Sequence, residues 1–182
     1  MTNRKLDAQR TALFGPPEEV KLKLLRAPLG SLLAKLIAAP RSDGEHVQLQ
    51  RLAHANVALH ELALVPFMRL VAAWGEAGLL GKVESFDKFY DVAEDGKRWG
   101  AHAWGNAFDV NSEWNELRTF GARRGEDGST HELEEVARPL GWVCGRQFVM
   151  GRAPRHFELL TLPAPAPLDS FVVEDVRIGG ES

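Results

Sequence analysis

The sequence predicts an α+β fold in which a small, mainly antiparallel sheet is flanked by helices. An apolar stripe at helical spacing runs through residues 60–80, which predicts a long helix. Short segments rich in Val and Phe, bounded by Gly, Pro and Asp, recur between residues 82 and 160 and predict strands. With 182 residues, 45% of them apolar, the chain is long enough for one domain with a core.

The N-terminal part predicts helices followed by an extended segment. Leucines recur at helical spacing over residues 18–39, and Pro28 and Gly30 divide this stretch into two short helices meeting at a kink. A turn at residues 41–44 follows, and patches of alternation in residues 47–60 predict a strand or an extended lead-in. We therefore expect residues 1–45 to form a helical extension packed on a domain of residues 46–162.

The middle of the chain carries the clearest signals. The helix at residues 60–80 has Gly78 as its stop signal, and a strand is predicted over residues 82–92. A polar loop follows, then a short strand at residues 107–110 and a long Gly-, Arg- and Asp-rich loop at residues 111–128.

The C-terminal part predicts one helix and two strands. The helix opens at Ser129 or Thr130, and Glu132 stands where a capping box with Ser129 needs an acid. Residues 141–160 predict two short strands around a Gly/Arg/Pro turn, and residues 163–182 form a proline-rich tail.

Charge and cysteine content exclude several classes of function. With a net charge of −3 and a pI near 6.1, the chain has no overall positive potential that would favour binding to nucleic acid. We therefore expect no nucleic-acid partner. Cys144 is the single cysteine, which excludes an intrachain disulfide and a four-cysteine zinc site. A metal would have to be held by histidines and carboxylates.

The sequence shows no membrane segment and no recognisable targeting signal. Residues 1–20 contain no apolar core of signal-peptide length, and the apolar stretches downstream are interrupted by charges or prolines. We therefore expect a protein synthesised in the cytoplasm, which would need another system to release it if it acts on a cell wall.

Two candidate metal ligands stand in the string HAWGNAFD. His102 and Asp109 are seven residues apart, and Gly105 and Ala107 between them keep the backbone unencumbered where two side chains must converge. A loop histidine and a strand aspartate can then face one ion. The competing interpretation is an unmetallated loop histidine with a capping aspartate.

The third candidate is the string HFE. On a strand, His156 and Glu158 point to one face while Phe157 packs on the other. Two imidazoles and a carboxylate leave the fourth tetrahedral position for water, which is the arrangement of a catalytic zinc site. The remaining histidines, such as His60 at the start of a helix, are expected to cap or pack instead.

From about residue 57 to residue 160, the chain resembles the zinc D-Ala-D-Ala carboxypeptidase and L-alanyl-D-glutamate endopeptidase family of cell-wall enzymes. Its signature is Ser-x-His-x-x-Gly-x-Ala-x-Asp, followed later by Asp/Glu-x-x-His. The resemblance implies a hedgehog/D-Ala-D-Ala-peptidase-like fold, zinc as cofactor, peptidoglycan stem peptides or related small peptides as substrate, and His102, Asp109 and His156 as zinc ligands. It supports the α+β fold more strongly than the periodicity does.

The chain departs from the family pattern at three positions. Ala153 occupies the place of the family's general base, three residues before the last ligand, and Gly100 replaces the signature serine. Ala93 stands near the place of a family arginine, for which Arg98 is the nearest substitute. An alanine cannot accept a proton, and a positioned base contributes roughly a hundred- to ten-thousandfold in rate.

Other residues are therefore candidates for the missing roles. Glu158 is the nearest substitute base, although in the family a glutamate at this place accompanies the true base and supports the metal site. Arg98, Trp104 and Arg155 are candidates for binding substrate, and Trp104 is equally consistent with wall packing.

Three hypotheses about function follow. The first is a zinc peptidase acting on peptidoglycan stem peptides. The second is an inactive pseudo-peptidase that keeps the metal for binding or stability, as hedgehog signalling domains do within the wider superfamily. The third is a working enzyme whose base was replaced by an engineered Ala153. Restoring an acid at that position discriminates among them.

Overall fold

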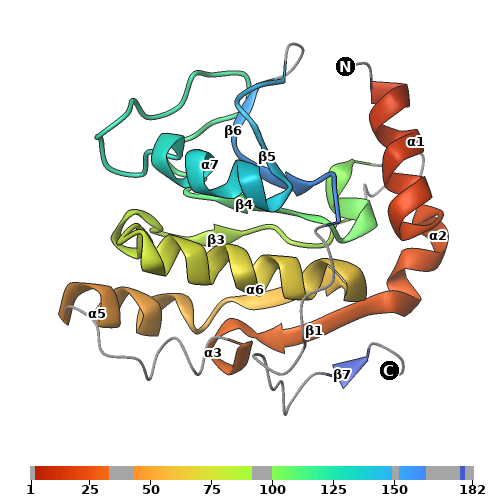
Figure 1. Cartoon of the computed structure of the whole chain (residues 1–182), viewed down its shortest axis with the longest axis horizontal. Helices are drawn as coiled ribbons and strands as arrows, with labels where there is room; N and C mark the ends of the chain where they lie inside the picture. Colours follow the sequence, from red (N-terminus) through yellow and green to blue (C-terminus); the bar gives the residue numbers. More distant parts are fainter. Residues whose placement is uncertain (1–2, 33–42, 92–99, 149–151, 163–176, 179–182) are drawn as a thin grey trace.

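The structure is a computed structural model that describes residues 3–32, 43–91, 100–148, 152–162 and 177–178. These residues form helices and two antiparallel sheets, so the predicted α+β class is confirmed (Figure 1). No helix in the described ranges is long and apolar enough to cross a membrane.

The larger sheet has four strands in the order β3-β4-β6-β5, and all neighbours are antiparallel. The strands predicted at residues 107–110 and around the turn of residues 141–160 are confirmed. Their bounds are β3, Phe86–Asp87; β4, Ala107–Val110; β5, Trp142–Gly145; and β6, Ala153–Leu159.

The smaller sheet has the order β2-β1-β7 and is also antiparallel. Strand β1 (Leu24–Pro28) pairs along its whole length with β2 (Asn56–His60). The two described residues of the C-terminal tail, β7 (Arg177–Ile178), pair with the other edge of β1. The rest of the tail, including its proline-rich segment from residue 163, lies outside the described residues.

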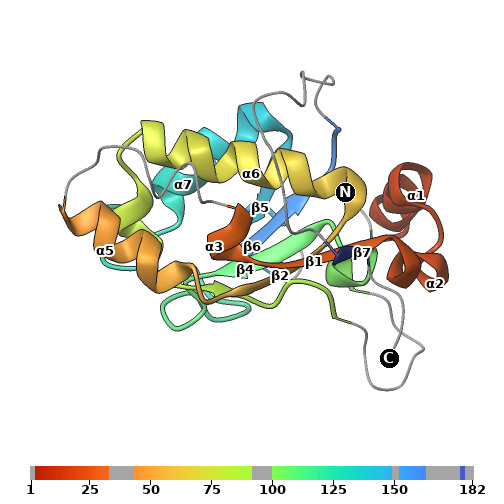
Figure 2. The same ribbon diagram turned by 90° about the horizontal axis from the view of Figure 1, so that it is seen from below.

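Helices cover one face of the sheets and one end of them. Figures 1 and 2 show α6 and α7 on the same side of the strands, with α1 and α2 at the end where η3 lies. The α-helices are α1, Asn3–Phe14; α2, Pro17–Val20; α3, Leu29–Leu32; α5, Asp43–Leu52; α6, Glu61–Glu76; and α7, His131–Ala137. The 3-10 helices are η1, Lys21–Lys23; η2, Leu80–Lys82; η3, Ala101–Trp104; and η4, Arg138–Leu140.

The core is an aromatic layer between α6 and the four-stranded sheet. Trp74 on α6 lies edge-on to Phe157 of β6, with ring centroids 5.6 Å apart, and Phe67 lies 5.2 Å from Phe108 of β4. Phe108 and Phe157 stack at 5.7 Å, and all four rings are fully buried. Packing on this scale makes the sheet a rigid support for the side chains on its other face.

The two best-defined predicted helices are confirmed. The imidazole of His60 caps α6 by accepting a hydrogen bond from the amide of Leu62 at 3.2 Å, and Gly78 follows the helix with φ +69°. Helix α7 starts directly after the predicted cap residues. There the Ser129 hydroxyl accepts from the His131 amide and donates to the Glu132 carboxylate at 2.9 Å.

The prediction of two helices in residues 18–39 is wrong in part. Residues 24–28 form strand β1, and helix covers only residues 17–23 and 29–32 of this described stretch. Leu24 and Ala27 are buried, and Pro28 ends the strand. Pairing with residues 56–60, far along the chain, outweighs the local leucine spacing that favoured a helix. Residues 33–39 lie outside the described residues.

The extended segment predicted for residues 47–60 is confirmed in its second half only. Strand β2 covers residues 56–60, but the first half belongs to α5, which ends at Leu52. Leu49 and Leu52 are three residues apart and both buried, which is helical rather than strand spacing. The alternation of polar and apolar residues in this stretch favoured a strand in the sequence analysis and outweighed the helical spacing of these two leucines.

The strand predicted for residues 82–92 is much shorter than expected. Only Phe86–Asp87 pairs with β4, and Lys88 follows in the left-handed region with φ +39°. That backbone conformation ends the ladder and directs the next residue, Phe89, into the core, where it lies 5.7 Å from Phe67. The polar loop predicted after it lies mostly outside the described residues.

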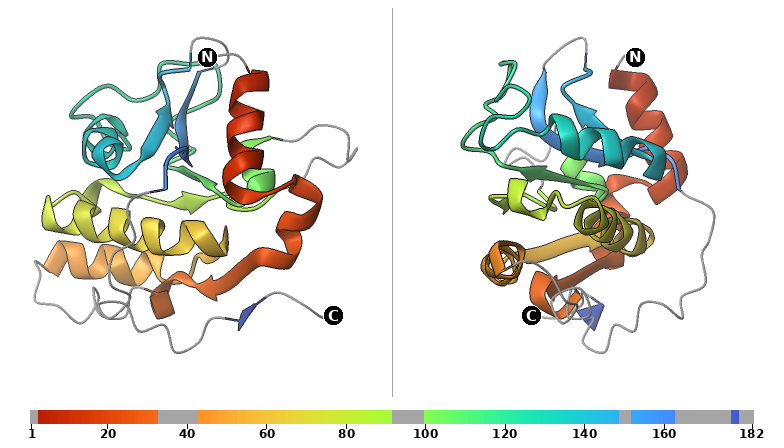
Figure 3. Two further views of the ribbon diagram at one scale, coloured as in Figure 1. Left: turned by 45° about the vertical axis from the view of Figure 1, so that its right-hand side comes forward. Right: turned by 60° about the vertical axis from the view of Figure 1, so that its left-hand side comes forward.

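The N-terminal segment contributes to the core as well as covering it. Phe14, Val20, Leu24 and Leu29 are buried in the same apolar cluster as the residues of α6 and the sheets. Figure 3 shows α1 standing beside β6, with η3 near its C-terminal end. The division of the chain at residues 45 and 162 stays a prediction, but α1 reaches the site described next.

Candidate metal centre

The three predicted metal ligands converge at one place. His102 lies on η3, Asp109 on β4 and His156 on β6, and Asp109 pairs with His156 in the ladder. Oδ1 of Asp109 lies 3.2 Å from Nε2 of His102 and 3.1 Å from Nδ1 of His156. One ligand atom from each residue lies within 4.8 Å of the others, so the cluster can hold a metal ion.

The other nitrogen of each imidazole is held by the protein. Nδ1 of His102 lies 2.7 Å from the carbonyl oxygen of Phe89, and Nε2 of His156 lies 3.6 Å from the Glu158 carboxylate. When each of these nitrogens carries the proton, Nε2 of His102 and Nδ1 of His156 direct their lone pairs at the shared centre. Acceptors placed in this way are typical of histidines that bind metals.

The two imidazoles favour an ionised Asp109 in spite of its burial. Burial by itself would raise the pKa of this carboxyl, but hydrogen bonds with His102 and His156 outweigh it and hold the pKa well below its usual range. Asp109 is 3% exposed. A buried carboxylate between two imidazoles is a strong attraction for a cation.

Glu158 is buried and held by an ion pair with Arg10 of α1. The Arg10 guanidinium donates from Nε to Oε1 and, at 2.8 Å, from Nη2 to Oε2. Asn106 lies 3.5 Å from Oε1, and Glu158 is fully buried. Burial would raise the pKa of Glu158, but hydrogen bonds from Arg10 and His156 lower it to about 2. The predicted proximity of His156 and Glu158 on one face is therefore confirmed, with Phe157 packed on the other.

These contacts define what Glu158 can do. Both of its oxygens are occupied by a bidentate guanidinium, which makes the carboxylate a poor proton acceptor. Its contact with His156 fits the alternative role that the resemblance implies, which is to support the metal site, and that role stays a prediction. Within the described part of the chain, the carboxylates in contact with the two imidazoles are Asp109 and Glu158.

Arg155 contacts Asp109, one of the three candidate ligands. Its Nε donates to Oδ2 of Asp109 at 2.9 Å, leaving Oδ1 facing the imidazoles. Its neighbour His156 reaches the same carboxylate because it pairs with Asp109 in the ladder, and β6 bulges on its other edge, where Phe157 pairs with Cys144 while Ala153 pairs with Gly145. The residues between Ala153 and Phe157 have no partner in β5. The side chains of Arg155 and His156, although consecutive, can therefore both point at Asp109. The predicted role of Arg155 in binding substrate is not tested.

The other candidates for binding substrate differ in their positions. Trp104 is 3% exposed, and the Arg10 guanidinium lies 5.4 Å from its ring centroid, so this tryptophan forms part of the wall. This position favours the wall packing that the sequence also allowed, and the role of Trp104 in binding substrate stays a prediction. Arg98 and Ala93 lie outside the described residues.

Ala153, at which the resemblance places the family's general base, is tightly packed. Ala153 begins β6 and is 9% exposed. A Cβ placed on Gly145 would lie 2.6 Å from the carbonyl oxygen of Ala153 and 3.0 Å from the Cβ of Ala153, so the backbones of these two residues are in close contact. Cys144 next to Gly145 is buried, and burial raises the pKa of its thiol to about 12.

Gly105 gives the motif its shape. It ends η3 with φ +62°, and its carbonyl accepts a hydrogen bond from the amide of His60 at 2.7 Å. A Cβ here would lie 2.7 Å from Leu24 Cδ2 and 2.8 Å from the amide nitrogen of His60. The sequence argument that this glycine keeps the backbone unencumbered is therefore confirmed.

We expect Gly105→Ala to lower the free energy of unfolding by at least about 2 kcal/mol, because it combines left-handed strain with a backbone clash. Urea denaturation followed by tryptophan fluorescence measures this. Gly100→Ala is the matched control, since no atom of the described residues lies within 4 Å of a Cβ at Gly100 and its φ is −85°. Equal stability of both variants would contradict the argument.

Sequence reasoning missed three groups at the centre. Arg10 lies 148 residues from its partner Glu158, and no local pattern in α1 marks it. Asn106, inside the motif, donates to the Leu159 carbonyl at 2.8 Å and so joins β4 to β6. The Phe89 carbonyl is a backbone group, which no sequence pattern reveals.

Comparison with known proteins adds no assignment. No protein-family model matches the chain, and neither a curated protein nor a solved structure does.

Proposed function

We propose that the protein binds a zinc ion through His102, Asp109 and His156 and hydrolyses peptides of the peptidoglycan stem. The observation that carries the proposal is the convergence of these three groups, each held by a further contact. Two imidazoles and one carboxylate are a common zinc donor set, and three protein ligands are the number found in catalytic sites. The substrate class rests on the family resemblance of the sequence.

The residues of the chain would divide the work as follows. His102, Asp109 and His156 would hold the zinc, which supplies a Lewis acid that lowers the pKa of bound water and polarises a carbonyl. Arg155 orients Asp109 through its second oxygen. Glu158, held by Arg10, orients His156. None of these groups is a free acid or base, so proton transfer would fall to another group.

A second candidate function is peptide or ligand binding without turnover. Two observations favour it: Ala153 stands at the base position, and Glu158, the nearest substitute, is fully engaged by Arg10. Under this hypothesis the centre keeps its metal for stability or binding. An engineered loss of the base would give the same structure and differs only in its origin.

The test is mass spectrometry of purified muropeptides after incubation with the zinc-loaded protein, beside a chelated sample. We expect slow, metal-dependent cleavage by the unaltered chain, and an increase of about a hundredfold or more with Ala153→Asp, because a base is restored. Ala153→Asn is the matched control, as it has nearly the same volume but cannot accept a proton.

Each outcome assigns the function. Cleavage by the Asp variant alone would favour the engineered or natural loss of a complete enzyme. Absence of cleavage by all three proteins, at full zinc content, would refute the peptidase and leave the binding module. Zinc content is measured in the same samples, so a lost metal cannot be mistaken for lost catalysis.

A further inference from the structure

The basic residues in the last third of the domain are all of one type. Residues 111–160 contain seven arginines and no lysine, although the whole chain has seven lysines. Arginine presents a planar fork of donors that matches the two oxygens of a carboxylate or phosphate, whereas lysine is a point charge. The arginines are Arg118, Arg123, Arg124, Arg138, Arg146, Arg152 and Arg155.

Four of these arginines line one cavity of about 480 Å³, a size within the range of small-ligand sites. The cavity lies between the loop of residues 111–128, the start of α7 and the residue preceding β6. Among the described residues no acidic side chain lines it. We call it the arginine pocket, and its main lining residues are Phe120, Arg123, Arg124, His131, Arg146 and Arg152.

The positive charge of the arginine pocket is only partly compensated. Arg124 pairs with Glu135 at 3.2 Å, and Arg146 lies 3.8 Å from Glu134. The guanidinium groups of Arg123 and Arg152 make no ion pair with any described residue, and both side chains are exposed. Two cations therefore line the cavity without an acidic partner among the described residues.

The pKa of His131 reflects the positive charge around it. Burial lowers the pKa of this imidazole, and the neighbouring charges of Arg146 and Arg124 lower it further. A neutral His131 adds a polar group without adding charge. The pocket is thus positive on a protein whose net charge is −3.

Further contacts hold the residues of the arginine pocket in place. The Arg152 guanidinium lies 4.1 Å from the ring centroid of Phe120, which is 73% exposed. Arg146 donates to the Phe120 carbonyl and, at 2.7 Å, to the Thr130 hydroxyl. The Arg118 amide donates to the Arg152 carbonyl at 2.6 Å, which ties the loop to β6. Groups fixed in this way lose little entropy when they bind.

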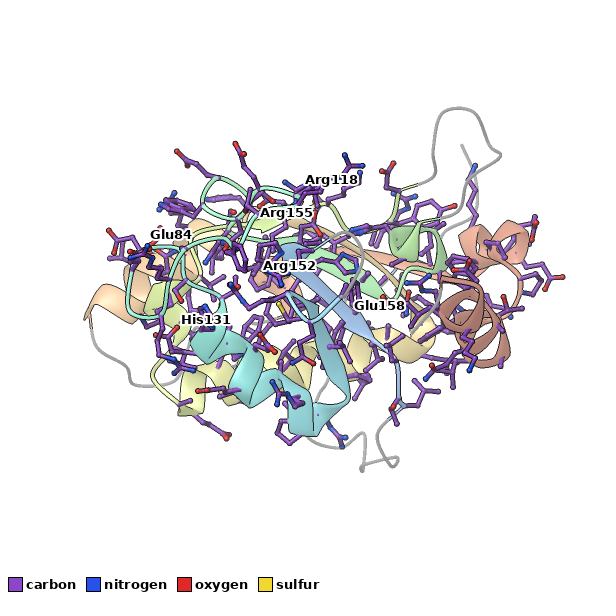
Figure 4. The ribbon with its side chains drawn as sticks, turned by 90° about the horizontal axis from the view of Figure 1, so that it is seen from above. Glu84, Arg118, His131, Arg152, Arg155 and Glu158 are labelled. Carbon is purple, nitrogen blue, oxygen red and sulfur yellow. The ribbon has the colours of Figure 1, made fainter. Side chains whose placement is uncertain are left out.

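We propose that the arginine pocket binds an oxyanion, a carboxylate or a phosphate group, through the guanidinium groups of Arg123 and Arg152. Figure 4 shows Arg118, Arg152 and Arg155 close together at the end of β6 opposite to Glu158. Arg152 precedes His156 by four residues, at most about 13 Å of extended chain. The pocket therefore lies close to the candidate metal centre, and binding in the pocket requires no metal.

The test is calorimetric titration of the full chain with inorganic phosphate and, separately, with glutarate, at constant ionic strength. We expect saturable binding that is the same in zinc-loaded and chelated protein. Arg123→Gln and Arg152→Gln should each weaken it on the order of tenfold, because each removes a charge-assisted fork. Arg26→Gln, at an exposed position on β1, is the matched control and should leave affinity unchanged.

Tighter binding of phosphate would identify a phosphorylated ligand, and tighter binding of glutarate would identify a carboxylate such as a peptide carries. Equal weakening by Arg26→Gln, or no saturable binding of either anion, would overturn the proposal. No hydrogen bond or ion pair joins the Arg123 side chain to another described residue, so the Arg123→Gln variant tests binding even if Arg152→Gln unfolds. Binding that disappears on chelation would place the anion at the metal instead.

Discussion

His102→Ala is expected to lower zinc affinity by on the order of a thousandfold or more. The estimate follows from dividing a zinc-binding free energy of roughly 10–16 kcal/mol among a few ligands. Nε2 of His102 is one of the three candidate ligand atoms, and His156 is the only other described histidine in the cluster. Competition with a chromogenic chelator measures the affinity.

The same variant should lose the stabilisation that zinc provides. Zinc at a thousandfold excess over its dissociation constant adds about 4 kcal/mol to the native state, which raises the melting temperature of a chain of this size by on the order of 10 °C. In the variant the rise should vanish, while the melting temperature without metal changes little. His54→Ala is the control, since His54 is exposed and outside the cluster. Unchanged affinity in His102→Ala would refute the proposed ligand set.

Arg10→Met is expected to lower the free energy of unfolding by about 3–5 kcal/mol, the usual cost of leaving a buried charge without its partner. Glu158 is fully buried, and Arg10 holds both of its oxygens. Thermal unfolding should show a melting temperature lower by on the order of 10 °C. Methionine keeps much of the packing volume against Trp104, so the lost charge dominates the effect.

Two further variants separate this ion pair from simple packing. The double variant Arg10→Met with Glu158→Gln removes the unpaired charge and should recover much of the lost stability. Asp7→Asn removes only the half-exposed partner of Arg10 and should cost less than about 1 kcal/mol. A double variant no more stable than Arg10→Met would show that the pair contributes little.

The Arg10 variant also tests how α1 acts on the metal centre. Glu158 contacts Nε2 of His156, and removing such a supporting contact typically costs ten- to a hundredfold in metal affinity. We expect a loss in that range for Arg10→Met, measured by chelator competition at a temperature where the variant is folded. An unchanged affinity would limit α1 to stabilising the fold.

The sequence predicted those elements whose signals are local. The helix at α6 has apolar residues at helical spacing and its own stop, and the strands around the bulge carry alternating residues. It failed at β1, α5 and β3, where pairing with a distant strand, a hidden helical spacing and one left-handed residue decided the outcome. These decisions depend on partners or angles that a short window of sequence does not contain.

The sequence by itself determined which residues can bind the metal, because His102, Asp109 and His156 stand in strings whose spacing and residue types already fit a cation. The tertiary structure alone decided how they are held. It brought Arg10 onto Glu158, turned Arg155 onto Asp109 through the bulge of β6, and gathered arginines from separate segments around one cavity. The physical reason is that ligand identity is a property of side chains, whereas buried charge balance depends on residues that only folding makes neighbours.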